Sequence, residues 1–380
     1  MIVGVVKETE GGERRVALDP DSVARLIKKG VEVHVQSGAG DGAFHGDAAY
    51  EAAGATVVPD AVSVWQHSNV ILKVNPPTPD EVGLLQSQAI IIGFLNPLRD
   101  PERIQRIAER GASAFSMEMI PRISRAQSMD ALSSQSSVAG YKAVLLAASA
   151  LAKFFPMMTT AAGTVRPARV FVIGAGVAGL QAIATARRLG AEVEAFDIRP
   201  VVKEEVQSLG ARFVEVELEE EAEAEGGYAK EVSEVARKRE QDLLAEHVAS
   251  ADVVITTAQV PGKKAPVLVT QTMLAAMKPG SVVVDLAADQ GGNVELSQPD
   301  KEVSYNGVTI LGPANLPSSL PVHATQMYAK NLMTLLDVIL QDGELRLDLE
   351  DEIVDASLVV HAGEVRNERV REAIAAERAA

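Results

Sequence analysis

The chain contains no cysteine, and this absence removes several classes of chemistry at once. Disulfides, thiolate nucleophiles and metal sites built on cysteine ligands are all excluded. The start of the chain, MIVGVVKETE, lacks the basic segment and the apolar core of a signal peptide. No uninterrupted apolar run reaches the ~18 residues that a membrane-spanning helix requires. The sequence therefore predicts a cytoplasmic protein that is soluble by itself.

Basic residues are in deficit, with 36 Lys and Arg against 52 Asp and Glu and a formal net charge of −16. This balance disfavours nucleic acid and an anionic membrane surface as direct partners. Hydrophobic residues make up 47% of the 380 positions, so the chain can bury substantial cores. A chain of this length has room for two or three domains.

Apolar runs alternate with helical patterns over residues 2–117, which predicts a parallel sheet with helices on both faces. The first predicted helix has clear start and stop signals, with Asp19 as N-cap, Pro20 in the first turn and Gly30 after its end. The expected strands are 2–6, 31–35, 70–74, 89–94 and 112–117, and the expected helices are 20–29, 48–53, 79–86 and 101–109.

A second region of the same kind has candidate strands at 170–173, 193–197, 212–214, 253–256, 282–285 and 308–311. Six strands with helices between them are what a full dinucleotide-binding domain requires. A long helix from about Ser133 to Phe154 precedes it, and an amphipathic helix over Ala324–Leu340 follows and is expected to return to the first domain. The tail from Glu344 is expected to add a short strand pair and a frayed, charged end.

These patterns predict an α/β fold of two Rossmann-like, doubly wound domains joined by long helices. The first domain is discontinuous and comprises residues 1–127 and 316–380. The second comprises residues 128–315.

The stretch from Arg169 to Arg199 carries the most specific motif. Gly174, Gly176 and Gly179 have G-x-G-x-x-G spacing between an expected strand and an expected helix. The first glycine permits a tight turn, the second lets a pyrophosphate approach the backbone, and the third lets helix and strand pack closely. The pyrophosphate then rests on the amides of a helix N-terminus.

Asp197 closes the next strand, 23 residues after Gly174. The carboxylate that accepts a hydrogen bond from the adenosine ribose 2′-hydroxyl is expected after ~20 residues, and it repels a 2′-phosphate. The motif therefore predicts NAD(H) rather than NADP(H), although Arg199 alone argues the other way. Ala175, Val177, Ile198, Ala258 and Gln259 are further expected nucleotide contacts in this domain.

Gly38, Gly40 and Ala43 give a second match to the same glycine pattern after an apolar run. Asp41 would lie beside the phosphates, and no acid closes a following strand at the right distance. We interpret this match as a turn.

The segment VELEEEAEAEGGYAKEVSEVARKREQD is too long and too polar for an ordinary connection. It is either a solvated acidic surface segment or a mobile lid over about residues 217–242. In the second case Gly226 and Gly227 are the hinge, and Gly227 and Tyr228 contact the nucleotide.

Several stretches together are specific: KETEGGERRVALDP, GAGDGAF, LKVNPP, IPRISRAQSMDALSSQSSVAGY, GGYAKE and DLAADQGGN. Over nearly the whole chain the sequence resembles the NAD(H)-binding component of proton-translocating nicotinamide nucleotide transhydrogenase, and the RISRAQSMD loop is its most discriminating feature.

The resemblance implies a homodimer of two-domain protomers with a cleft between the domains. It implies direct hydride transfer between NAD(H) and NADP(H) held by a partner subunit, coupled to proton movement through membrane subunits. The chain would then be cytoplasmic and attached to the inner face of the cell membrane through those partners, with no nucleic acid involved.

The resemblance also assigns roles in the polar loop. Arg122 and Asp130 would hold the nicotinamide carboxamide, with Ser133 and Arg125 nearby, and Gln127 would reach toward the partner's nucleotide. A carboxamide offers one acceptor and two donors, so an arginine and a carboxylate fix which ring face is presented. Arg122, Gln127 and Asp130 are thus the candidate catalytic residues, although Arg122 and Asp130 could instead be a surface ion pair.

The same architecture resembles alanine dehydrogenase, in which a keto acid is reduced and protons must be handled. Arg15, Lys73 and Asp289 match residues of such a site, but Asn96 occupies the place of the catalytic histidine, and an amide cannot shuttle a proton at neutral pH. We interpret Arg15, Lys73 and Asp289 mainly as structural.

A third possibility is a non-catalytic NAD(H) sensor, which the fold alone does not exclude. The histidines show no ligand spacing, so we expect no metal site.

Overall fold

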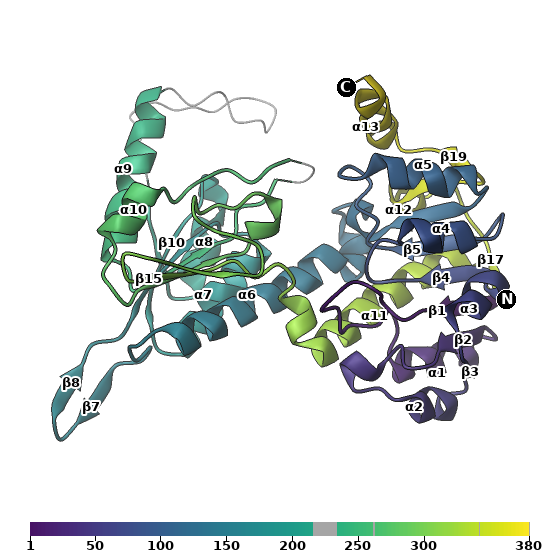
Figure 1. Cartoon of the computed structure of the whole chain (residues 1–380), viewed down its shortest axis with the longest axis horizontal. Helices are drawn as coiled ribbons and strands as arrows, with labels where there is room; N and C mark the ends of the chain where they lie inside the picture. The colour runs from purple at the N-terminus through teal and green to yellow at the C-terminus, as the bar shows by residue number, and fades with distance from the viewer. Residues whose placement is uncertain (216–233, 261–262, 342, 380) are drawn as a thin grey trace. The chain divides into compact units, whose positions relative to one another are not determined.

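The computed structural model describes residues 1–215, 234–260, 263–341 and 343–379. The predictions for Gly226, Gly227, Tyr228 and most of the acidic segment lie outside these residues. The chain forms two compact units, one of Met1–Gln135 with Pro317–Ala380 and the other of Ser136–Leu316 (Figure 1). The expected boundaries, near 127 and 316, differ from these by eight residues at the first junction and by one at the second.

The first unit contains a mostly parallel sheet with the strand order β19-β18-β6-β5-β4-β1-β2-β3 among the described residues. Strand order reverses at β1, since β2 lies on one side of it and β4 on the other. The C-terminal strand β18 pairs antiparallel with β6, and β19 pairs antiparallel with β18, so the unit is discontinuous in sequence. Its strands are β1 (Ile2–Val5), β2 (Glu32–Gln36), β3 (Thr56–Val58), β4 (Val70–Leu72), β5 (Ile90–Gly93), β6 (Ser113–Ser116), β18 (Leu358–His361) and β19 (Glu364–Val365).

Successive residues of these strands point to opposite faces, and both faces are buried. Val3, Val5 and Leu72 belong to a core with the helices α1, α11 and α12, whereas Ile71 and Ile91 belong to a core with α3, α4, α5 and α13. Runs of valine and isoleucine are typical of strands covered on both sides. The helices are α1 (Pro20–Lys28), α2 (Asp47–Ala52), α3 (Ala61–His67), α4 (Pro79–Leu84), α5 (Pro101–Glu109), α11 (Pro321–Ile339), α12 (Glu352–Ser357) and α13 (Glu368–Ala379).

The second unit contains a sheet with the order β11-β10-β9-β12-β13-β15-β14, parallel except for β14 at its edge. Strand order reverses at β9, which lies between β10 and β12. The strands are β9 (Arg169–Ile173), β10 (Glu192–Phe196), β11 (Arg212–Phe213), β12 (Val253–Thr256), β13 (Val282–Asp285), β14 (Glu302–Tyr305) and β15 (Val308–Leu311).

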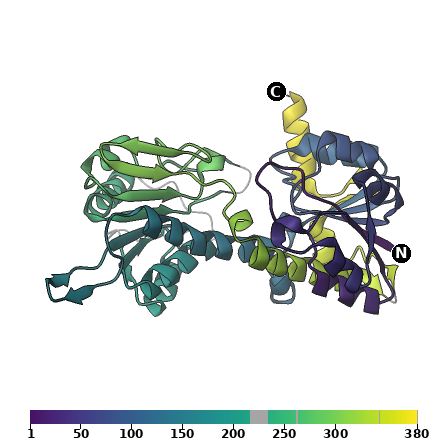
Figure 2. The same cartoon turned by 60° about the horizontal axis from the view of Figure 1, so that its bottom comes forward.

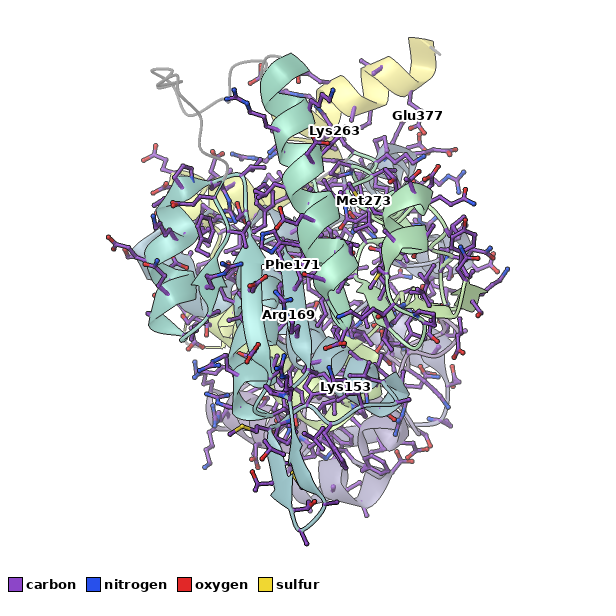
Figure 3. All side chains as sticks on the ribbon, turned by 90° about the vertical axis from the view of Figure 1, so that its left-hand side faces the viewer. Lys153, Arg169, Phe171, Lys263, Met273 and Glu377 are labelled. Atoms are coloured by element: carbon purple, nitrogen blue, oxygen red, sulfur yellow. The ribbon has the colours of Figure 1, made fainter. Side chains whose placement is uncertain are left out.

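Helices cover both faces of this sheet as well. On one face, Val170 and Val172 pack with α6 (Ala131–Ala150), α7 (Val177–Arg188) and α8 (Lys203–Ser208). On the other, Phe171 packs with α9 (Glu234–Ser250) and α10 (Gln271–Ala276). Figure 3 looks onto this second face, where Arg169 and Phe171 lie on β9 beside α9 and Met273 lies on α10. The α/β fold with two doubly wound, Rossmann-like sheets is thus confirmed.

Two short hairpins complete the strands, β7 (Met158–Thr160) with β8 (Gly163–Val165) and β16 (Leu340–Gln341) with β17 (Glu344–Leu345). The β7–β8 hairpin stands out from the sheet of its unit in Figure 1 and Figure 2.

Some elements are not expected from the sequence. These include β3, α3 and α12 in the first unit, β14 in the second and the β7–β8 hairpin. They are short, and no long apolar period marks them. The C-terminal segment also contains helix α13 in place of the expected frayed end, because Val370 is fully buried against the first sheet.

Candidate functional site

The glycine loop lies at the point where the strand order of the second unit reverses. Gly174 follows β9 with φ +99°, a conformation that favours glycine. A side chain at Gly179 would overlap the carbonyl oxygen of Gly174, so this glycine allows α7 to pack on the loop. At Gly176 an added methyl group would meet no atom within 4 Å, which leaves open space at the N-terminus of α7.

This open space fits the phosphates of a dinucleotide. Gly176 is the N-cap of α7 and provides no side-chain cap, so the first amides of a twelve-residue helix remain for an anion. In open α/β sheets, ligands bind at the carboxyl ends of the strands where the order reverses.

Asp197 follows β10 on one side of this loop, and its carboxylate is already organised. Its Oδ2 accepts a hydrogen bond from the amide of Ala175 at 2.7 Å. Arg199 donates from Nε to Oδ1 and from Nη2 to Oδ2, both at 2.9 Å. Burial alone would raise the pKa of Asp197, but the hydrogen bonds from Arg199 and Ala175 outweigh it and lower the pKa below its usual value. The carboxylate is therefore ionised at neutral pH.

The expected neighbours of this loop differ in exposure. Ala175 is buried under the loop, whereas Val177 and Ile198 are exposed beside Gly176 and Asp197 in the sequence, and Ile198 is 71% exposed. An exposed isoleucine next to Asp197 is an apolar surface on which a base can lie.

The loop after β12 borders the glycine loop on its other side. The hydroxyl of Thr257 donates to the carbonyl of Gly174 at 3.0 Å. The side-chain amide of Gln259 donates to the carbonyl of Leu286 at 2.7 Å, and the amide of Ala258 donates to Oδ1 of Asn293 at 3.0 Å. No sequence pattern singled out Thr257 or Asn293. The only signal for Asn293 was its place at the end of DLAADQGGN.

In the polar loop of the first unit, two exposed side chains have no bonded partner among the described residues, whereas a hydrogen bond holds the loop backbone. Arg122 and Gln127 are exposed, and within the described portion of the chain neither side chain has a hydrogen bond or an ion pair. The loop includes a 3₁₀ segment over Ser124–Met129, and Asn331 on α11 donates to the carbonyl of Ser128 at 2.8 Å.

Asp130 and Ser133 lie at the start of α6. The Asp130 carboxylate accepts from the amide of Ser133 at 2.8 Å and from its hydroxyl at 2.6 Å, which caps the helix. Asp130 therefore does not form an ion pair with Arg122 in this structure.

Arg125 points to another partner. Its guanidinium forms two hydrogen bonds of 2.7 and 2.9 Å with Asp351, the N-cap of α12. Hydrogen bonding to Asp351 raises the pKa of Arg125. The pair connects the polar loop to α12, so Arg125 has a structural role here, and whether it also contacts a nucleotide stays a prediction.

The residues matched to alanine dehydrogenase all have interaction partners. In the first unit, Arg15 donates to both carboxylate oxygens of Glu13, at 2.8 and 2.6 Å, and to Gln135 at 3.0 Å. Lys73 is 1% exposed, with its Nζ 2.8 Å from Glu81 and 3.5 Å from Glu8. Asp289 lies in a 3₁₀ turn of the second unit and also has an interaction partner.

The loop containing Asn96 is held by the carboxylate of Glu118, a half-buried residue. Glu118 accepts hydrogen bonds from the amides of Leu95 and Asn96 and from the hydroxyl of Ser116. Burial raises the pKa of Glu118 despite these hydrogen bonds. Asn96 itself is exposed with φ +51°.

The second glycine match does form a turn. Gly38 has φ +72°, and its amide donates to the carboxylate of Asp47 at 2.8 Å, so the chain's own acid lies where an anionic ligand would. A side chain at Gly40 would collide with His45 and Tyr50. These glycines are explained by packing.

The described residues contain no group of three or more His, Asp and Glu side chains that could hold a metal ion. Among the described helices, none combines the length and apolarity needed to cross a membrane.

The glycine loop, the uncapped helix and the strand-end aspartate place the second unit in the dinucleotide-binding class of α/β folds. Residues 4–139 match the family model for the alanine dehydrogenase/PNT N-terminal domain, and residues 143–368 match that for the C-terminal domain. The chain belongs to the alanine dehydrogenase/PNT family.

Within the family, the chain is similar to transhydrogenase subunits. It is 46% identical to an NAD(P) transhydrogenase subunit alpha chain of Rhodospirillum rubrum, over 96% of this chain and 97% of that protein. A crystal structure of transhydrogenase from Sinorhizobium meliloti superimposes with a TM-score of 0.85 at 44% identity, covering 97% of this chain and 99% of the other. The alanine dehydrogenase of Halomonas elongata is a more distant relative, 33% identical over 99% of this chain and 98% of that protein. The resemblance to transhydrogenase subunits seen in the sequence is thereby confirmed.

Proposed function

We propose that this protein is the NAD(H)-binding subunit of a proton-translocating transhydrogenase. Hydride passes directly between NAD(H) on this chain and NADP(H) on a partner subunit, and membrane subunits couple the transfer to proton translocation. The similarity to subunits named NAD(P) transhydrogenase supports this proposal at the level of the family.

One contrast in the structure carries the proposal beyond the family. Arg122 and Gln127 are exposed and unengaged on a loop that Asn331 and Asp351 hold in place. Lys73 and Arg15, the cationic side chains that binding of a keto acid would need, are buried in ion pairs. The chain thus offers side chains that can orient a nucleotide at its surface, while the cations matched to a keto-acid site are already engaged.

The residues of the second unit fit the adenosine and pyrophosphate portions of NAD(H). Asp197 accepts a hydrogen bond from the adenosine ribose, and the backbone at Gly174, Gly176 and Val177 receives the pyrophosphate. Ala175 and Gly179 hold this loop in shape, while Ile198 and Arg199 flank the ribose. Ala258 and Gln259 border the other half of the nucleotide.

The residues of the polar loop orient the nicotinamide. Arg122 donates to the carboxamide oxygen, and Asp130, with Ser133 fixing it, accepts from the carboxamide nitrogen. Gln127 extends toward the partner's nucleotide. When bound, NAD(H) supplies or accepts the hydride at C4 of its ring.

Positioning is the catalytic contribution that these residues can make. Hydride transfer needs donor and acceptor carbons held at roughly 3–3.5 Å, and no proton moves at that step. A general acid or base is therefore unnecessary, which agrees with an amide at position 96.

We further propose that the protein acts as a homodimer and is held at the inner face of the cell membrane by its partner subunits. NADP(H) belongs to one of those partners. The second unit is then the NAD(H)-binding domain.

Reconstitution with the NADP(H)-binding subunit of a related transhydrogenase tests the proposal. The isolated chain should bind NADH, but it should catalyse neither hydride exchange with an NADP analogue nor reduction of NAD by alanine. Addition of the partner should start hydride exchange between NADH and the NADP analogue. Reduction of NAD by alanine with the isolated chain would contradict it in favour of an amino-acid dehydrogenase. Nucleotide binding with no exchange in the presence of the partner would contradict it in favour of a sensor.

A further inference from the structure

Asn293 has no role in the site described above, yet its side chain is fully engaged in hydrogen bonds beside that site. It is 0% exposed and follows two glycines, Gly291 and Gly292, that both adopt positive φ. The backbone turn at these glycines directs Asn293 toward the loop that follows β12.

The Asn293 side chain clamps the backbone of that loop at two places. Its Oδ1 accepts from the amide of Ala258 at 3.0 Å, and its Nδ2 donates to the carbonyl of Ala258 at 2.9 Å. The same Nδ2 donates to the carbonyl of Pro266 at 2.8 Å. An amide is suited to this position, because it presents an acceptor and two donors in one plane.

A second buried residue fixes the clamp itself. Asp285, at the end of β13, accepts from the amides of Asn293 and Val294 through Oδ2, at 2.9 and 3.1 Å. Its Oδ1 accepts from the amide of Ala287 and the hydroxyl of Thr256. The backbone carbonyl of Asn293 in turn receives the amides of Leu268 and Val269. The backbone of Asn293 is therefore held rigidly by these hydrogen bonds.

The position of Ala258 indicates what the rigid contacts of Asn293 contribute to the site. Asp197 follows β10 on one side of β9, and Ala258 follows β12 on the other side. A dinucleotide centred on the glycine loop extends to both sides, so its adenosine half lies toward β10 and its nicotinamide half toward β12. Thr257 adjoins Ala258 and already bonds Gly174 in the glycine loop.

We propose that Asn293 is a positioning residue that sets the backbone of Ala258 and Gln259 against the nicotinamide half of NAD(H). This inference rests on the proposed binding of NAD(H) and adds the residue that shapes the nicotinamide side of the crevice. Asn293 does not touch the nucleotide. It acts through the backbone of Ala258.

The proposal distinguishes two ligands. NADH extends to both sides of β9, whereas ADP contains only adenosine and two phosphates. Replacing Asn293 by Asp removes the donor and places a carboxylate oxygen against two carbonyls, so the loop must move. NADH should lose affinity, and ADP should not.

The experiment compares the variants Asn293→Asp and Asn293→Ser with the wild type, using NADH fluorescence and calorimetry with ADP. Both variants should raise the Kd for NADH at least tenfold and leave the Kd for ADP within twofold. Asn306→Asp is the matched control, since Asn306 is exposed in the β14–β15 turn of the same unit and its change of charge is identical.

A measurement on the wild type does not depend on how well the variants fold. Amide hydrogen exchange of the peptide spanning 257–260 should slow when NADH binds and should stay unchanged with ADP. Equal slowing of exchange by NADH and ADP would overturn the proposal. Equal losses of affinity for NADH and ADP in the variants would also overturn it, and so would variants that bind NADH as tightly as the wild type does. If the wild type bound ADP but not NADH, both the proposed function and this inference would fail. Titration of the wild type alone would give that result before any variant is made.

Discussion

Arg199 holds Asp197 at two points, with Nε 2.9 Å from Oδ1 and Nη2 2.9 Å from Oδ2. The side chain of Asp197 is only 6% exposed, whereas that of Arg199 is 53% exposed. The carboxylate is therefore ionised and oriented before any nucleotide arrives, and the guanidinium lies beside the position expected for a ribose 2′ substituent.

The charge of Asp197 should determine cofactor choice. Asp197→Asn removes the negative charge while Arg199 remains, so the repulsion of a 2′-phosphate falls and NADPH gains relative to NADH. We expect the ratio of the two dissociation constants to change at least tenfold, measured by nucleotide fluorescence titration. Glu192→Gln, which changes an exposed acid at the start of the preceding strand β10, is the control. An unchanged ratio would mean that Asp197 does not contact the ribose.

Alanine substitutions at Gly176 and Gly179 should distinguish an effect on nucleotide affinity from an effect on folding stability. Gly176→Ala adds a methyl group where no atom lies within 4 Å, so the melting temperature should stay within about 2 °C of the wild type while the Kd for NADH rises at least tenfold. Gly179→Ala places a methyl group onto the Gly174 carbonyl and should lower stability by about 1–3 kcal/mol as well as weaken binding. Thermal unfolding and NADH titration of both variants check this. If Gly176→Ala bound NADH normally, the pyrophosphate would lie elsewhere.

Gln127 should affect hydride transfer more than nucleotide binding. Gln127→Asn shortens the side chain by one methylene, so its reach toward the partner's nucleotide is lost, and transfer should slow at least tenfold while the Kd for NADH stays within twofold. Single-turnover kinetics with the NADP(H)-binding partner measure the first quantity and fluorescence the second. Ser124→Ala, an exposed change on the same loop, is the control. Equal losses in both quantities would place Gln127 in the primary NAD(H) site instead.

The fold of the second unit could be predicted almost completely, because buried parallel strands are runs of valine and isoleucine and the glycine pattern marks the turn at Gly174. Asp197 could be assigned a role for the same reason. Asn293 could not, since its contacts with Ala258 and Pro266 join residues about 30 positions apart and leave no local pattern. In the polar loop, the sequence permitted an ion pair between Arg122 and Asp130. The structure instead uses Asp130 as a helix cap, because the amide and hydroxyl of Ser133 lie one turn away.

Glu194 should contribute to stability in a way that depends on pH. Burial opposes ionisation of Glu194, but hydrogen bonding from His247 and the charge of Arg212 outweigh it and lower its pKa below 4.5. The contribution is therefore fully present above pH 4.5 and is lost as the pH falls through the folded-state pKa. Urea unfolding at pH 7 and pH 4 should show a smaller loss on acidification for Glu194→Gln than for the wild type. Glu192→Gln should behave as the wild type, and the same loss in all three proteins would contradict this assignment.

Direct transfer of hydride can be followed most plainly with a label. NADH carrying deuterium at the transferred C4 position is mixed with this chain, the NADP(H)-binding partner and an oxidised NADP analogue, and the reduced product is analysed by mass spectrometry. In the proposed function, positioning at the polar loop replaces proton chemistry, so the deuterium should be retained fully at C4 of the product. Deuterium lost to solvent, or found at Cα of an amino acid formed from a keto acid and ammonia added to the mixture, would contradict the account.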